Sequence, residues 1–168
     1  MARRRFTRNK RQYIWTAVQI QDNAVNTTAV SNNIVDRTDW AVQTSFNKGA
    51  VLERIRGSYS IIMNSVTTQG AEVWLAIYKQ NDDETAADPA TVGDYVDNDC
   101  LWQRVHSFRT VQSTAVGFGA MARVDGEIDV KARRRIDSNT LINFVFVATN
   151  VTGIARISGL IRGLVAVP

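Results

Sequence analysis

Hydrophobic and polar residues alternate with a period of two along most of the chain, most clearly in residues 51–63 and 127–136. Successive side chains of a β-strand point to opposite faces, so this period predicts strands with one buried and one exposed face. Most of the apolar positions hold β-branched or aromatic residues, which suit a pleated surface. The pattern predicts strands in residues 13–21, 51–63, 71–78, 101–108, 127–136, 141–148 and 154–167, with another after the bend at 117–119.

Some of these segments differ from the simple alternation. Residues 71–78 are apolar on both faces apart from Glu72, which is typical of a strand in a sheet covered on both sides. A turn-like sequence separates them from residues 51–63, and the two strands could form a hairpin. Residues 24–35 are rich in Asn, Thr and Val and are interpreted as a loop or a weak edge strand.

Residues 81–99 break the alternation, with seven acidic residues and no basic one. The pair Asp88-Pro89 resembles a helix N-cap followed by a first-turn proline, so we expect a long acidic loop that contains a short helix. Its carboxylates could gather a cation such as calcium, but their spacing does not match the known calcium-loop motif. A solvated loop, or one that meets basic residues of another copy, fits the sequence better.

The strand pattern leads to an all-β fold. No segment has the 10–15-residue amphipathic pattern of a helix, and Gly159 and Gly163 argue against a helix near the C-terminus. At 168 residues the chain can bury one hydrophobic core. We therefore expect an eight-stranded antiparallel jelly-roll sandwich, with a short basic N-terminal arm in residues 1–12 and one domain in residues 13–168.

The formal charge of +4 is distributed unevenly. Residues 1–11 contain six basic residues and no acidic one, whereas residues 12–168 carry 14 basic and 16 acidic residues, a net charge of −2. A basic excess confined to one terminus is the pattern of an interaction tail for a polyanion. The basic residues of this arm are Arg3, Arg4, Arg5, Arg8, Lys10 and Arg11.

The arm is dense enough to neutralise about six phosphates, which predicts salt-sensitive, sequence-independent nucleic-acid binding. Phe6 or Tyr13 could in addition stack on a single-stranded base. The alternative interpretations are a solvated tail and a nuclear-import signal, and the second is compatible with binding.

A second basic run occupies a predicted strand. Lys131, Arg133 and Arg135 share one face, and Arg134 points the opposite way, among apolar residues. This face is a possible additional basic site, for nucleic acid or for the acidic loop of a neighbouring subunit. Alternatively, it protects an edge strand against unwanted pairing.

Catalysis finds little support in the sequence. His106 is the only histidine and Cys100 the only cysteine, and an extended strand would separate their side chains by about 20 Å. His106 also lacks the context of a zinc site, so we interpret it as an exposed or hydrogen-bonded strand residue. We expect no enzyme activity, no metal and no cofactor. The four tryptophans are interpreted as core or subunit-interface residues.

The sequence also bears on compartment. A single cysteine allows no intramolecular disulfide, which fits a reducing compartment. The longest uncharged stretch, residues 138–155, contains many Ser, Thr and Asn residues. It is therefore interpreted as a buried strand and its turn, and we expect no membrane association.

The arm, the strand opening at residues 51–57 and the segment at residues 128–135 together carry a resemblance to a known class of protein. A polyarginine arm that enters an eight-stranded domain of this size resembles the single jelly-roll capsid proteins of small icosahedral viruses. The likeness is greatest to the circovirus-like single-stranded DNA viruses, although the arm here is shorter than theirs.

The resemblance implies a viral capsid protein that self-assembles into an icosahedral shell of about 60 copies, or a multiple of that number. The implied partners are other copies of the chain and a single-stranded nucleic acid, DNA in preference to RNA, held by the arm. The implied location is the virion, with passage through the host nucleus during assembly. The alternative is a cellular nucleic-acid-binding β-barrel module.

Overall fold

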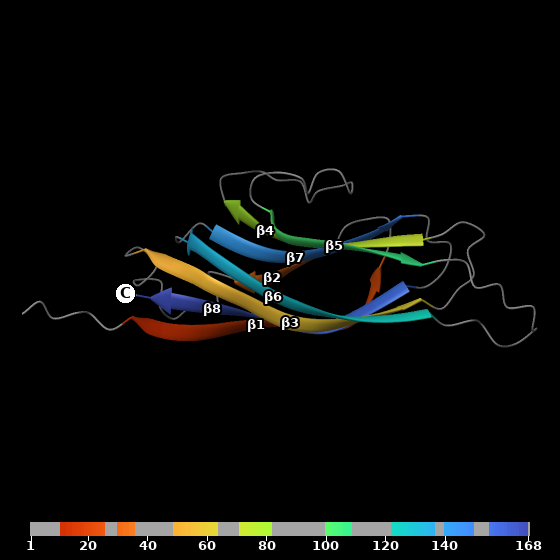
Figure 1. Ribbon diagram of the computed structural model, residues 1–168, viewed down its shortest axis with the longest axis horizontal. Helices are drawn as coiled ribbons and strands as arrows, with labels where there is room; N and C mark the ends of the chain where they lie inside the picture. The colour runs from red at the N-terminus through yellow and green to blue at the C-terminus, as the bar shows by residue number, and fades with distance from the viewer. Residues whose placement is uncertain are drawn as a thin grey trace, which may run out of the picture.

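The computed structural model describes residues 11–25, 30–35, 49–63, 71–81, 100–108, 122–136, 140–149 and 155–167, and eight strands make up almost all of this part of the chain (Figure 1). No helix occurs within these ranges. The strands are β1 (Gln12–Val25), β2 (Val30–Val35), β3 (Ala50–Met63), β4 (Ala71–Asn81), β5 (Cys100–Phe108), β6 (Ala122–Ile136), β7 (Thr140–Thr149) and β8 (Ala155–Val167).

The strands form two antiparallel four-stranded sheets that lie face to face (Figure 1). Sheet A has the order β1-β8-β3-β6 and sheet B has the order β2-β7-β4-β5. Strands that follow one another in the chain mostly belong to opposite sheets, and strands distant in sequence pair within a sheet. This arrangement is a jelly roll, so the predicted fold class is confirmed.

The predicted hairpin between residues 51–63 and 71–78 is wrong. β3 pairs with β6 and β8 in sheet A, whereas β4 pairs with β5 and β7 in sheet B. Alternation along a strand shows which side chains are buried but not which strand lies beside it. β3 and β4 instead belong to opposite sheets, so that their apolar rows contribute to the same core.

Other sequence predictions agree with the described strands. β7 is a central strand with a buried run of apolar residues, and β2 lies at an edge of sheet B, where a weak edge strand was one expectation. The short helix expected in residues 81–99 falls outside the described residues. Among those described, there is no helix of the length and apolar character that a membrane crossing requires.

The core lies between the two sheets. On each strand, one row of apolar side chains points inward. The inward side chains of the two sheets interdigitate, as in other sandwiches. Burying each such side chain contributes about 1.5–3 kcal/mol. The largest fully buried side chains include Leu52, Ile55, Ile61, Leu75, Ile77, Ile142, Phe144, Phe146, Ile157 and Ile161.

Gly57 allows β3 and β8 to approach closely in the middle of sheet A. A Cβ atom on Gly57 would lie 2.6 Å from the Leu160 carbonyl oxygen and 2.9 Å from the Ile161 Cα. Both neighbours are backbone atoms, so they cannot rotate away as a flexible side chain would. The residue at this position therefore has no room for a side chain.

A hydrogen bond joins the two sheets near their β5 and β6 edges. The Tyr59 hydroxyl on β3 lies 2.7 Å from the His106 Nε2 on β5. The Tyr59 ring occupies the space beside Gly126 on β6, where a Cβ would approach the Tyr59 hydroxyl to 2.3 Å. His106 is therefore a hydrogen-bonded strand residue, one of the two states expected of it.

Burial lowers the pKa of His106, and the charge of Arg104 lowers it further. The neutral imidazole is thus favoured, and its Nε2 can accept a hydrogen bond from the Tyr59 hydroxyl. The Trp102 ring packs edge-on against Tyr59, with ring centroids 6.2 Å apart. Together these contacts connect β3 of sheet A to β5 of sheet B at one edge of the sandwich.

Gly57→Ala is expected to lower the free energy of unfolding by about 1–3 kcal/mol, because the added methyl group forces two paired backbones apart. Ser58→Ala, at the exposed neighbouring position, is the control and should change stability by less than about 0.5 kcal/mol. Urea denaturation followed by tryptophan fluorescence measures both. Equal midpoints for the two variants would contradict this account of Gly57.

The histidine makes folding depend on pH. Because the pKa of His106 is lower in the folded than in the unfolded chain, the unfolded state binds more protons below about pH 6.5. The free energy of unfolding is therefore expected to be highest above that pH and to decrease as the pH falls below it. His106→Gln should lose this dependence, since His106 is the only histidine. Urea titrations at several pH values test it, and an unchanged pH profile in the variant would refute it.

Candidate nucleic-acid interface

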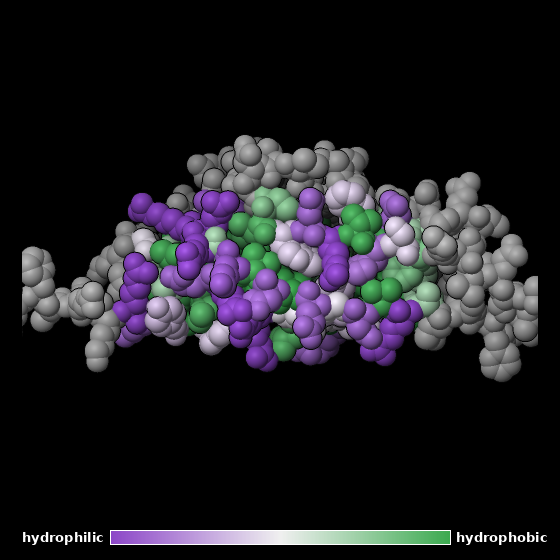
Figure 2. All heavy atoms as spheres, in the orientation of Figure 1, coloured by the Kyte–Doolittle hydropathy of each residue, from purple (hydrophilic) through white to green (hydrophobic). Residues whose placement is uncertain are grey.

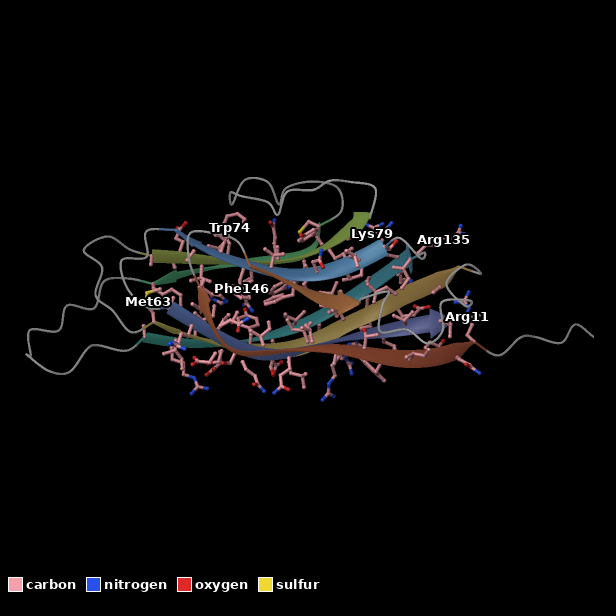
Figure 3. The ribbon with its side chains drawn as sticks, turned by 180° about the vertical axis from the view of Figure 1, so that it is seen from behind. Arg11, Met63, Trp74, Lys79, Arg135 and Phe146 are labelled. Atoms are coloured by element: carbon pink, nitrogen blue, oxygen red, sulfur yellow. The ribbon has the colours of Figure 1, made fainter. Side chains whose placement is uncertain are left out.

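The outer face of sheet A is formed by the side chains that point away from the core on β1, β8, β3 and β6. Alternation assigns them: Ile14 and Val18 of β1 pack against the core, so the alternate residues Trp15 and Ala17 point outward. Arginine and lysine side chains are frequent on this face. Nitrogen-tipped side chains project from the outer side of the sheet in Figure 3.

Positive charge concentrates in sheet A. Residues 11–25, 49–63, 122–136 and 155–167 contain ten basic and five acidic residues, a net charge of +5. The described strands of sheet B contain two basic residues and one acidic residue, a net charge of +1. The net charge of −2 in residues 12–168 thus conceals a basic sheet, because three basic and ten acidic residues lie outside the described ranges.

Part of this charge is compensated by ion pairs. The Arg54 Nε donates to the Asp129 Oδ1 at 2.5 Å, and a second nitrogen of Arg54 donates to Oδ2. The hydrogen bonds from Arg54 hold the pKa of Asp129 below its usual range. Arg56 lies 3.6 Å from the same carboxylate. One carboxylate therefore serves two guanidinium groups, and such exposed pairs contribute little to stability.

The predicted basic residues of β6 are exposed. Lys131, Arg133 and Arg135 lie on an edge strand of sheet A and form no ion pair with another described residue. Lys131 lies opposite Arg54 in the register, so the second basic run adjoins the basic residues of β3.

The register puts Arg134 on the side of the sheet that holds apolar residues, as predicted, but its side chain is exposed. Arg134 lies opposite the buried Leu52, but β6 is the last strand of the sheet and leaves room for a long side chain to reach solvent. The register also shifts here, and Arg133 has a φ of 46°. This irregularity interrupts the regular strand on which the prediction was based.

The described chain begins at the end of the basic arm. Arg11 is exposed and lies 3.6 Å from Glu53 on β3, so the arm joins the domain beside sheet A (Figure 3). The other five basic residues predicted to bind nucleic acid, Arg3, Arg4, Arg5, Arg8 and Lys10, lie outside the described residues.

Two aromatic side chains are exposed close to this junction. Tyr13 is 60% exposed and Trp15 is 52% exposed, both on the outward side of β1. Tyr13 was a predicted stacking residue, whereas Trp15 was expected in a core or an interface. The signal for Trp15 was present in the alternation of β1, but the sequence did not show which of its two faces is buried.

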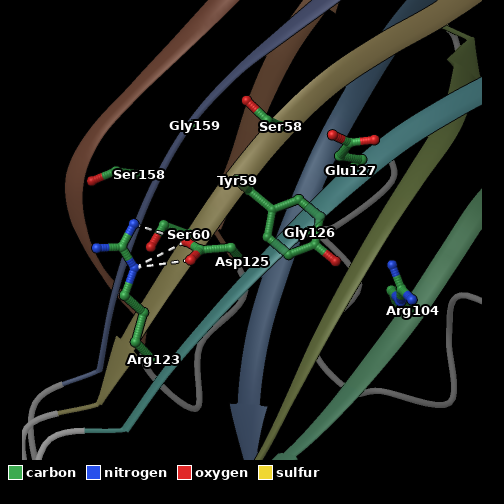
Figure 4. Close-up of a pocket in the computed structure, with 10 residues that line it drawn as sticks. All are labelled: Ser58, Tyr59, Ser60, Arg104, Arg123, Asp125, Gly126, Glu127, Ser158 and Gly159. Carbon is green, nitrogen blue, oxygen red and sulfur yellow. Dashed lines mark hydrogen bonds and ion pairs between the residues drawn. The ribbon is translucent and has the colours of Figure 1, made fainter.

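An open cavity of about 620 Å³ lies at the β6 edge (Figure 4). Its lining includes Tyr59, Arg104 and Glu127, together with the ion pair between Arg123 and Asp125 at 3.0 Å. The described lining contains no histidine or cysteine, and no group of described residues could hold a metal ion. In the same orientation as Figure 1, Figure 2 shows hydrophobic side chains interspersed among hydrophilic ones on the face that it presents.

The sequence matches no protein-family model, and no curated protein is significantly similar to it. Among solved structures, the chain is similar to that of Desmodium yellow mottle tymovirus, with 14% identity over 95% of this chain and 88% of the other and a TM-score of 0.37. For the Gx strain of infectious bursal disease virus the identity is 10%, over 93% of this chain, with a TM-score of 0.42. This chain spans only 36% of that longer one.

The chain is also similar to the semi-empty virus-like particle of the Macrobrachium rosenbergii nodavirus, from the giant freshwater prawn. The identity is 10% over 99% of this chain and 87% of the other, and the TM-score is 0.36. At such low identities and TM-scores, these likenesses carry no argument about function.

Proposed function

We propose that this chain is the coat protein of a small icosahedral virus, and that it assembles into a shell and contacts the packaged genome through its basic arm. The observation that carries the proposal is a jelly roll whose first strand is preceded by six basic residues. The sandwich is a rigid domain that can pack beside other copies to form a shell, and the arm supplies a sequence-independent contact with a polyanion.

Jelly rolls also occur in lectins and cupins, so the fold alone does not distinguish a coat protein from a carbohydrate-binding protein or an enzyme. The residues of the candidate site provide that distinction. A metal-dependent cupin needs several histidine and carboxylate ligands together, and the chain has one histidine, bonded to Tyr59. The open cavity at the β6 edge has an ion pair in its wall, and Tyr59 is the only aromatic or large apolar residue among its described lining, whereas ligand pockets are lined mainly by such residues. These features support a structural role over an enzymatic one.

The partners in this proposal are other copies of the chain, about 60 or a multiple of that number, and a single-stranded genome. The resemblance to circovirus-like viruses favours DNA over RNA, and places the protein in the virion after a passage through the host nucleus. Lys131, Arg133 and Arg135 would add a basic surface for the genome or for an acidic loop of a neighbouring subunit.

The charge of sheet A favours one alternative, a cellular nucleic-acid-binding β-barrel module. Such a module carries its basic excess on the fold, and the net charge of +5 in sheet A meets that requirement. The two functions differ in assembly, because the module binds as a monomer or a small oligomer.

Purified full-length chain is expected to form closed particles many times heavier than its own mass of 18.7 kDa. Analytical ultracentrifugation over a range of salt and pH, with negative-stain microscopy of the heavy fraction, measures this. A chain that stays monomeric or dimeric under all these conditions would rule out the coat-protein function and leave the module.

Replacing Arg3, Arg4, Arg5, Arg8 and Lys10 by glutamine should weaken binding of single-stranded DNA and reduce its salt dependence. The slope of log K against log salt is negative, and about five fewer phosphate contacts make it less steep by about 3.5, at about 0.7 per contact. Replacing the four arginines by lysine keeps the charge and should keep the slope. Titration of a labelled oligonucleotide at several salt concentrations measures this, and equal slopes for the two variants would argue against the arm as the binding element.

A further inference from the structure

Two neighbouring rows on the outer face of sheet A hold more positive than negative charge. One row runs across the four strands as Trp15, Leu164, Arg54 and Lys131. The next outward row runs as Ala17, Arg162, Arg56 and Asp129. Together they contain four cations and one carboxylate. We refer to these eight residues as the Trp15 surface.

Within the second row, two cations lie directly opposite each other. Arg56 of β3 and Arg162 of β8 are register partners, and both side chains are exposed. Like charges at such opposed positions destabilise a sheet unless something compensates them. Asp129 compensates only in part, because it already accepts two hydrogen bonds from Arg54 and lies 3.6 Å from Arg56. Arg162 forms no ion pair with another described residue.

Trp15 lies at the end of the first row and is diagonal to Arg162. Trp15 is opposite Leu164 on β8, and Arg162 is two residues further along the same face. Diagonal neighbours of this kind are about 7–8 Å apart. A half-exposed indole therefore lies within side-chain reach of a guanidinium group that no described carboxylate compensates.

We propose that the Trp15 surface binds single-stranded nucleic acid, with a base stacked on the Trp15 indole and the adjoining phosphates held by Arg162 and Arg56. An aromatic ring beside a positively charged track is the combination by which proteins hold unpaired strands. The arm adjoins this surface through the Arg11–Glu53 pair, so one strand can run from the arm onto the sheet. This inference deepens the proposed function, because the packaged genome is the expected occupant.

The proposal differs from a purely electrostatic contact in its need for unpaired bases. Trp15→Leu should weaken binding of a 20-nucleotide oligothymidylate about 5-fold to 150-fold, since it removes one stacked base. Trp15→Phe retains an aromatic face and should bind nearly as tightly as the unmodified chain. A 20-base-pair duplex has its bases stacked already, and its affinity should be the same for all three proteins. Fluorescence anisotropy of labelled DNA with the full chain measures these affinities.

The phosphate contacts have a matched control. Arg56→Gln with Arg162→Gln removes two charges from the Trp15 surface, whereas Lys79→Gln with Arg104→Gln removes the only two basic residues on the described strands of sheet B. For oligothymidylate, the first double variant should make the negative slope of log K against log salt less steep by about 1.4, and the second should leave it unchanged. Equal slopes for the two double variants would overturn the proposal.

Particle formation, measured by light scattering in the absence of DNA, separates this inference from the proposed function. Loss of particles in Trp15→Leu with unchanged oligothymidylate binding would show that the surface contacts a second copy of the chain, and would overturn the inference. If no protein forms particles but binding still requires Trp15, the coat-protein function fails and the inference stands. Thermal unfolding of each variant shows that it is folded, as expected for changes at exposed positions.

Discussion

The packing of two apolar sheet faces against each other is the constraint on which the rest of this structure depends. Each strand contributes one inward row, and the rows of β3 and β8 face those of β4 and β7. Because each sheet has one face committed to the core, its other face is left to interact with solvent or a partner. The charge of sheet A and the exposure of Trp15 both follow from this division.

At one edge the sandwich depends on polar contacts as well as apolar ones. Tyr59 crosses from sheet A, fits against the bare backbone of Gly126 and meets His106 of sheet B. Its ring fills the space that a side chain at Gly126 would occupy, and its hydroxyl forms a hydrogen bond with His106, as a buried phenol requires. Burial and the charge of Arg104 explain why the only histidine of the chain favours its neutral form. The hydrogen bond to Tyr59 makes that histidine part of the contact between the two sheets.

The distribution of charge joins the fold to the proposed function. Taken as a sum, residues 12–168 are slightly acidic, so their total charge does not indicate a basic surface on the domain. In the folded chain the basic residues of β3, β6 and β8 lie on one sheet, so the arm and the sheet have the same sign. In the proposed function, binding by the arm and binding by the domain are therefore compatible parts of one nucleic-acid interface that includes Arg56 and Arg162.

Sequence alone determined most of the strands, the concentration of basic residues near the N-terminus and the all-β class, because side-chain alternation and charge are local properties of the chain. It could not determine strand partners, since the pattern of residues 51–63 suits any neighbour, and so the expected hairpin with 71–78 was wrong. Nor could it bring Arg56 beside Arg162, which are 106 positions apart in the chain. Only the tertiary structure decided which face of β1 is buried, because that choice depends on the sheet opposite. The tertiary structure thereby decided that Trp15 lies on the same outward face as the basic residues of β8, β3 and β6.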